Sequence, residues 1–198
     1  MKTLMLGLLF SITMCLSSIF ALPYPVEQEL LNELDLQLKL YQEDPSSNER
    51  IFELSMSYAY TGQVDKGWEL LKTIPMSYAE DVILKYSNLI KSDPTNWKYY
   101  FKIAFGYYFN KQVDVAIDQF QRVIKLNPEN VWAYGFIALI YNEMEKPKHS
   151  ILYCKQAIKI EPQATAIYAL QGIAYLKQKK FFKAFTSYRK FKKLYAKH

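Results

Sequence analysis

Apolar residues in the second half of the chain recur at the three- and four-residue spacing of one helix face, in paired runs divided by a short polar turn. The first complete pair follows Pro94, and its apolar positions are Tyr100, Ile103, Ala104 and Tyr107, then Ala116, Phe120 and Val123. The same pattern returns after a fixed interval as Tyr134, Ile137, Ala138 and Tyr141, then Ser150, Cys154 and Ala157. After the same interval again it is Tyr168, Gln171, Gly172 and Tyr175, then Ala184, Tyr188 and Phe191. The pattern predicts three helix pairs.

Prolines mark the ends of these units. The interval from Pro94 to Pro128 equals that from Pro128 to Pro162, whereas the interval from Pro45 to Pro94 is longer. A proline cannot continue a helix, and the residues after it can cap the next one. Each proline is therefore predicted to lie between two units.

The same offsets occur in weaker form upstream, as Ile51, Leu54, Ser55 and Tyr58, then Gly67, Leu71 and Ile74. They predict a degenerate fourth repeat. The interval between Pro45 and Pro94 is longer than one unit, and residues 77–94 predict an additional helix in it. Before all of these, Leu30, Leu31, Leu34 and Leu38 predict a leading helix.

The repeated unit resembles the tetratricopeptide repeat in its length and in its signature. That signature is an aromatic residue, a Leu-Gly pair and a Tyr, then an Ala, an aromatic residue and a terminal Pro. The chain departs from it at Ile103-Ala104, which lacks the Gly, and at Ser150, Cys154 and Gln171. The resemblance covers residues 48–196. It implies an all-α fold, a right-handed α-solenoid of antiparallel helix pairs, with a concave groove lined by the first helix of each pair.

The expected organisation has four parts. They are a signal peptide at 1–21, an N-terminal helix at 22–44, the degenerate repeat with the additional helix at 45–94, and three repeats at 95–198. Lys2, an apolar run from residue 4 to 10 and a cleavage position after Ala21 predict the signal peptide. An uncleaved anchor is the alternative. Export favours the periplasm or cell envelope of a bacterium.

Residues 96–112 contain more aromatic rings than one buried helix face can hold. Tyr100, Ile103, Ala104 and Tyr107 form the structural face, and a second face lies roughly 110° away at about 100° per residue. The resemblance assigns that second face to the groove. The predicted groove residues are Phe101, Phe105, Tyr108, Phe109, Trp132, Leu139 and Ile173.

The predicted partner of this groove is a protein or peptide with an apolar segment, because large exposed apolar surfaces usually mark binding sites. In the alternative, the leading helix or the additional helix covers these rings, and they belong to the core.

The C-terminal helix is basic and aromatic. Its candidate binding residues are Lys180, Lys183, Arg189, Lys190 and Lys193. In one interpretation they only keep the exposed end of the stack polar and hydrated. In the other they bind an acidic protein or an anionic lipid.

Composition and charge limit the function. A hydrophobic fraction of 51% with 22% charged residues is typical of a folded protein. Residues 22–81 contain 12 acidic and 4 basic residues, whereas residues 82–198 contain 7 acidic and 20 basic residues. No nucleic-acid recognition motif accompanies the basic half. After removal of the signal peptide, Cys154 is the remaining cysteine, so no disulfide within the mature chain is expected.

Candidate catalytic chemistry is sparse. The two histidines are His149 and His198, and the six glycines form no phosphate-binding or dinucleotide motif. Asp114 and Asp118 are better explained as a helix cap and a dipole partner than as an acid-base pair. The sequence predicts no catalytic residue, no metal site and no cofactor.

Two functions fit these observations. The first is an exported, non-enzymatic interaction scaffold of a cell-envelope assembly or secretion apparatus. The second is a structural subunit, a homo-oligomer joined end to end through its acidic N-terminal half and its basic C-terminal half.

Overall fold

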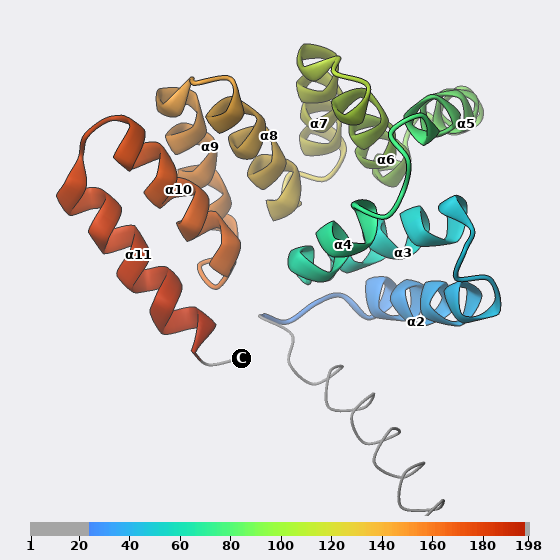
Figure 1. Ribbon diagram of the computed structural model, residues 1–198, viewed down its shortest axis with the longest axis horizontal. Coiled ribbons are helices and arrows are strands. Elements are labelled where there is room, and N and C mark those ends of the chain that lie inside the picture. The colour runs from blue at the N-terminus through green and yellow to red at the C-terminus, as the bar shows by residue number, and fades with distance from the viewer. Residues whose placement is uncertain (1–23, 197–198) are drawn as a thin grey trace, which may run out of the picture.

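The computed structural model describes residues 24–196, and within that range it contains ten α-helices and no strand (Figure 1). The predicted signal peptide lies outside the described residues. The helices are α2 (Gln28–Glu43), α3 (Asn48–Tyr60), α4 (Val64–Leu71), α5 (Tyr78–Ser92), α6 (Trp97–Phe109), α7 (Val113–Leu126), α8 (Val131–Glu143), α9 (Pro147–Ile160), α10 (Thr165–Lys177) and α11 (Phe181–Tyr195). The prediction of an all-α fold is confirmed.

The helices stack in chain order as antiparallel neighbours. In Figure 1 the helices α5 to α11 follow an arc. α2, α3 and α4 lie near the α5 end of this arc, away from α11. The closest pairs are α6 with α7, α8 with α9, and α10 with α11, which are the three predicted repeats. α9 also packs on α10, so each pair is covered by the first helix of the next.

Small residues let the two helices of a pair approach closely. A Cβ atom on Gly67 of α4 would lie 2.7 Å from the backbone oxygen of Ser55 in α3. Ala104 and Ala116 are fully buried between α6 and α7. Close packing of this kind explains why the repeat alternates small and large residues.

The tyrosine near the start of each first helix has a second role. Its hydroxyl donates a hydrogen bond to the carbonyl oxygen of the preceding proline: Tyr100 to Pro94 at 3.2 Å, Tyr134 to Pro128 at 3.2 Å, and Tyr168 to Pro162 at 3.1 Å. The bond ties the start of each helix to the preceding turn. This contact explains why the tyrosines and prolines recur in the same phase.

The turn inside each pair has one residue with left-handed backbone geometry. The φ angle is 79° at Gly62, 62° at Lys111, 55° at Glu145 and 56° at Lys179. Such a φ costs a residue with a Cβ atom roughly 1 kcal/mol. The three later repeats therefore carry a small strain that the degenerate repeat avoids with glycine.

We expect Lys179→Gly to raise the free energy of unfolding by up to about 1 kcal/mol, because glycine removes this strain. Urea unfolding followed by circular dichroism measures the change. Arg189→Gly is the matched control: Arg189 lies exposed in the middle of α11, where glycine should lower stability by roughly 1 kcal/mol. Equal losses in both variants would contradict the prediction.

The helix α5 occupies the long interval between the degenerate repeat and the first regular one. It packs on α6 so closely that a Cβ atom on Gly106 would lie 2.9 Å from Ile83 and 3.1 Å from Val82. α5 therefore takes the place beside α6 that the second helix of a preceding repeat would have.

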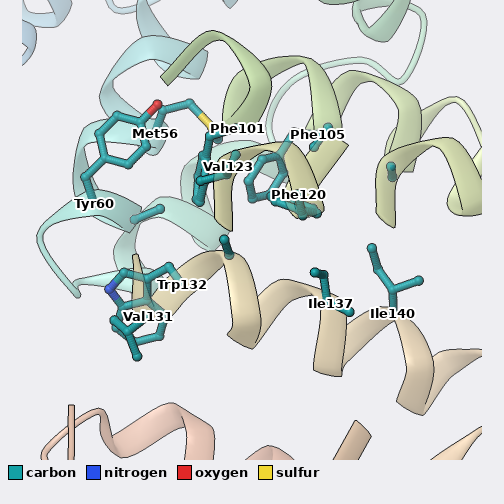
Figure 2. Packing of buried hydrophobic residues seen from close by; sticks show 14 of the residues in the cluster. Met56, Tyr60, Phe101, Phe105, Phe120, Val123, Val131, Trp132, Ile137 and Ile140 are labelled. Carbon is teal, nitrogen blue, oxygen red and sulfur yellow. The ribbon is translucent and has the colours of Figure 1, made fainter. Parts of the chain in front are cut away.

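The central core lies between α3, α6, α7 and α8. Figure 2 shows Met56 and Tyr60 of α3 next to Phe101 of α6, and Phe105 next to Phe120 of α7. Because α3 reaches this core, the N-terminal helices are folded against the repeats.

Candidate protein-binding site

The structure corrects the prediction for two groove residues. Phe101 and Phe105 are 0% and 2% exposed, so no partner can reach either ring. The ring of Phe101 contacts Tyr60 of α3 at 4.9 Å between centroids, and that of Phe105 contacts Phe136 of α8 at 4.7 Å. Aromatic area on the inner side of α6 is buried by neighbouring repeats, which stabilises the fold.

Phe101 and Phe105 instead follow the alternative prediction, in which these rings belong to the core. The helices that cover them are nevertheless different from those expected. Tyr60 comes from α3, Phe120 from α7 and Phe136 from α8. The leading helix α2 contacts α6 through an ion pair instead, Lys98 with Glu33 at 2.6 Å.

Two further predicted residues, Tyr108 and Phe109, are half-buried at the end of α6. Trp68 of α4 stacks on Phe109, with 6.1 Å between centroids. Both predicted residues line a cavity of about 430 Å³ that α4, α5 and α6 share. The hydroxyl of Tyr108 donates to the carboxylate of Glu143 at 2.9 Å, and burial together with that carboxylate raises the pKa of Tyr108.

A hollow on the inner side of the arc, called here the inner cavity, has a volume of about 620 Å³. It lies between α4, α8, α10 and the end of α11. Its lining is apolar apart from two carboxylates, and consists of Val64, Asp65, Trp68, Glu69, Trp132, Gly135, Phe136, Leu139, Ala166, Ile167, Ala169, Leu170 and Tyr195. The predicted residues Trp132 and Leu139 both border it, but Trp132 is only 5% exposed and belongs mainly to the core.

The N-terminal segment fixes the position of Trp132. The indole N–H of Trp132 donates to the hydroxyl of Tyr24 at 2.5 Å, and the two rings stack with 6.4 Å between centroids. Burial is the main cause that raises the pKa of Tyr24. The partners are 108 residues apart in sequence, so this contact joins the start of the described chain to α8, although Tyr24 does not itself line the inner cavity.

The wall formed by α4 was not predicted from the sequence. Asp65, Trp68 and Glu69 lie on the second helix of the degenerate repeat, whereas the groove was expected on first helices alone. One signal was present: Trp68 is a large ring outside the repeat positions Gly67 and Leu71. Nothing in its spacing indicates that it faces α8, which is distant in the chain.

The remaining predicted residues lie on a different surface. Ile173 is exposed on α10, beside α11 rather than in the inner cavity. The basic residues are exposed on α11 and do not line the inner cavity: Lys180, Lys183, Arg189, Lys190 and Lys193.

The main buried charges belong to the core. The carboxylate of Glu53 on α3 accepts from Lys102 of α6 at 2.7 Å, from Lys85 of α5 at 2.8 Å, and from the hydroxyl of Tyr86. Burial alone would raise the pKa of Glu53, but the charge of Lys102 and these hydrogen bonds outweigh it and lower the pKa to about 2. The group joins α3, α5 and α6; Glu53 and Lys102 are buried, whereas the side chain of Lys85 is 37% exposed.

The structure also limits two other kinds of function over residues 24–196. In that range no three His, Cys, Asp or Glu side chains gather where they could hold a metal ion. None of the helices there has the length and apolar character needed to cross a membrane.

Models of the tetratricopeptide repeat match residues 99–130, 133–163 and 168–198. A search of curated proteins gave no match. Among solved structures, a crystal structure of MamA is similar with a TM-score of 0.56 and 21% identity, over 83% of this chain and 87% of that chain. A second MamA crystal structure is similar with a TM-score of 0.57 and 22% identity, over 85% of this chain and 84% of that chain.

MamA from Desulfovibrio magneticus RS-1 is similar at a TM-score of 0.54 and 13% identity, over 86% of this chain and 88% of that chain. At these identities the likeness shows the fold. The constant repeat period, the paired helices and the three matched segments agree with one another. The chain therefore carries tetratricopeptide repeats, stacked as a right-handed α-solenoid.

Proposed function

We propose that this protein is an exported, non-enzymatic scaffold that holds an apolar segment of a partner protein in the inner cavity. One observation carries the proposal: a hollow of about 620 Å³ has an apolar lining on the concave side of a repeat stack. Solenoids of helical repeats bind their partners on such concave surfaces. The volume suits a few apolar side chains of one segment.

The lining also indicates what the segment should contain. Trp68, Leu139 and Tyr195 offer apolar and aromatic surface from three different helices. Asp65 and Glu69 add negative charge on the α4 side. An apolar segment with a Lys or Arg beside it would bury its apolar side chains and place its charge near these carboxylates.

Export and the cell-envelope location are part of the proposal and depend on residues 1–21. Lys2, the apolar run that follows and Ala21 have the order of a secretory signal. A bacterial assembly or secretion apparatus is the proposed setting.

We expect Leu139→Ser and Ala166→Phe each to abolish capture of one particular protein from a native envelope extract. The first removes apolar contact area, and the second fills the cavity. Mass spectrometry of the captured material is the measurement. Both variants should keep the melting temperature within about 5 °C, because each changes half-exposed surface.

Leu152→Ser is the matched control, since Leu152 is an exposed leucine on α9 outside the cavity. It should capture the same protein as the unmodified chain. Capture that survives both Leu139→Ser and Ala166→Phe would refute binding in the inner cavity.

End-to-end self-association stays a prediction. α2 carries the acidic residues Glu29, Glu33 and Asp35, but Leu36 is its one large apolar side chain that is exposed. Such a contact would depend on charge, so sedimentation at low and high salt tests it.

A further inference from the structure

The last helix pair ends in an apolar groove, called here the terminal groove, with a volume of about 410 Å³. It lies between α10 and α11, and the one lining residue that it shares with the inner cavity is Ala169. Its large side chains are Tyr168, Ile173, Leu176, Phe181, Phe185, Tyr188 and Phe191. Phe185 is 60% exposed and Tyr188 is 54% exposed, so the groove lies open to solvent.

In each earlier repeat a helix covers the corresponding surface. The residues one repeat before Phe185 and Tyr188 are Ile151 and Cys154, which are buried. α10 packs over them, and Ile151 shares a cluster with Ala174 of α10. The first helix of each next repeat therefore occupies the place that is left open beside α11 in the described part of the chain.

The residues in the terminal groove differ from the polar residues that cover the solvent-exposed end of a repeat stack. A repeat that closes a stack needs a polar outer face. Here the positions held by Ile151, Cys154 and Ala157 in the previous repeat become Phe185, Tyr188 and Phe191, which are larger and offer more apolar area. Apolar and aromatic area of this kind favours an occupant that removes it from water.

Charge around the terminal groove has one sign. α11 contains no acidic residue, and its basic residues include Arg189, Lys192 and Lys193 on the turns that carry the rings. At about 100° per residue, Lys192 falls between Phe181 and Phe185 on the exposed face. Any occupant that buries the rings therefore comes close to cationic side chains, and acidic residues on it would be favoured.

We propose that the terminal groove binds an amphipathic helix of another protein whose apolar stripe is flanked by Asp and Glu. A helix fits because helices cover the same surface in the preceding repeats. The acidic flanks follow from the basic surroundings of the groove. This interaction is separate from the inner cavity and does not depend on the function proposed for it.

A second copy of this chain is a poorer occupant. Its acidic helix α2 buries Leu34, half-buries Leu30 and Leu38, and uses Glu33 in the ion pair with Lys98. Leu36 alone could not fill a groove lined by seven large side chains. A flat membrane surface also fits less well, because the rings surround a hollow that a helix can enter.

The test uses a synthetic, fluorescently labelled peptide of about 18 residues, long enough for five helical turns, with leucines along one stripe and glutamates beside it. We expect saturable binding to the full mature chain by fluorescence anisotropy, weakening as salt is raised. The variant Phe185→Ser with Tyr188→Ser should bind at least about tenfold more weakly. Its melting temperature should stay close to that of the unmodified chain, since both rings are exposed.

Phe182→Ser is the matched control. Phe182 is 92% exposed on α11 but does not line the groove, so its loss should leave binding unchanged. A peptide with lysine in place of every glutamate should bind at least about tenfold more weakly than the acidic peptide.

Four results would overturn the proposal. Equal binding of the acidic and lysine peptides would remove the acidic specificity, and equal losses in Phe182→Ser and the groove variant would show unspecific apolar attraction. Binding to phosphatidylserine vesicles that requires Phe185 and Tyr188, without binding of the acidic peptide, would assign the groove to a membrane. Failure to bind any of these probes would also refute it.

Discussion

Replacing Phe101 and Phe105 together with alanine is expected to unfold the protein at room temperature. Each Phe→Ala change in a packed core costs roughly 3–5 kcal/mol, and a domain of this kind has about 5–15 kcal/mol in total. Both rings are buried and contact Phe120 and Phe136, which would then border a large cavity. Circular dichroism and urea unfolding of the single and double variants measure the loss.

Phe182→Ala is the control, because the same side chain is removed from an exposed site on α11. It should change the free energy of unfolding by less than about 0.5 kcal/mol. If Phe105→Ala were equally mild, Phe105 could not lie in the core. Partner capture by the double variant is no test of binding, since its loss would follow from unfolding.

Breaking the buried ion pair between Glu53 and Lys102 is expected to have the next largest effect. Lys102→Met should cost about 3 kcal/mol, the lower end of the range for breaking a buried ion pair, because Lys85 and Tyr86 still bind the carboxylate of Glu53. Replacing both residues with methionine should cost less than the two single changes added together. Urea unfolding of the four proteins gives the coupling free energy. A coupling free energy near zero would contradict the buried ion pair between Glu53 and Lys102.

The same carboxylate predicts a dependence on pH. Folding lowers the pKa of Glu53 from its ordinary 4.5 to about 2, so its contribution to stability is complete above pH 4.5. It is lost as the pH falls through about 2. At about 1.4 kcal/mol per pKa unit the contribution is roughly 3 kcal/mol. Glu53→Gln should therefore lose stability less steeply than the unmodified chain between pH 4.5 and 2, as urea unfolding across that range would measure.

The sequence alone determined the repeat and the fold that follows from it. Tyr100, Tyr134 and Tyr168 recur in step with their prolines, and helix spacing is a local property that each segment carries by itself. The same spacing indicated which face of α6 holds Ile103 and Ala104. Local periodicity therefore predicted the helices, their pairing and the small residues between them.

Part of the candidate site could be predicted in the same way. Trp132 and Leu139 line the inner cavity, but Trp132 is only 5% exposed, and partner binding by these residues stays a prediction. Ile173 was assigned by the same angle, yet it lies in the terminal groove because the stack has no further helix there in residues 24–196. The angular position of a residue on its helix gives the direction of its side chain. Which helix packs against that side chain depends on where the stack ends.

Only the tertiary structure decided which rings are covered. Phe101 and Phe105 point to the inner side of α6, and there Tyr60 and Phe136 bury them. The contact between Tyr24 and Trp132, like the wall that α4 adds to the inner cavity, joins segments far apart in the chain. Helical periodicity fixes the orientation of a residue on its own helix, whereas burial depends on how distant helices pack. That packing is decided by the fold as a whole.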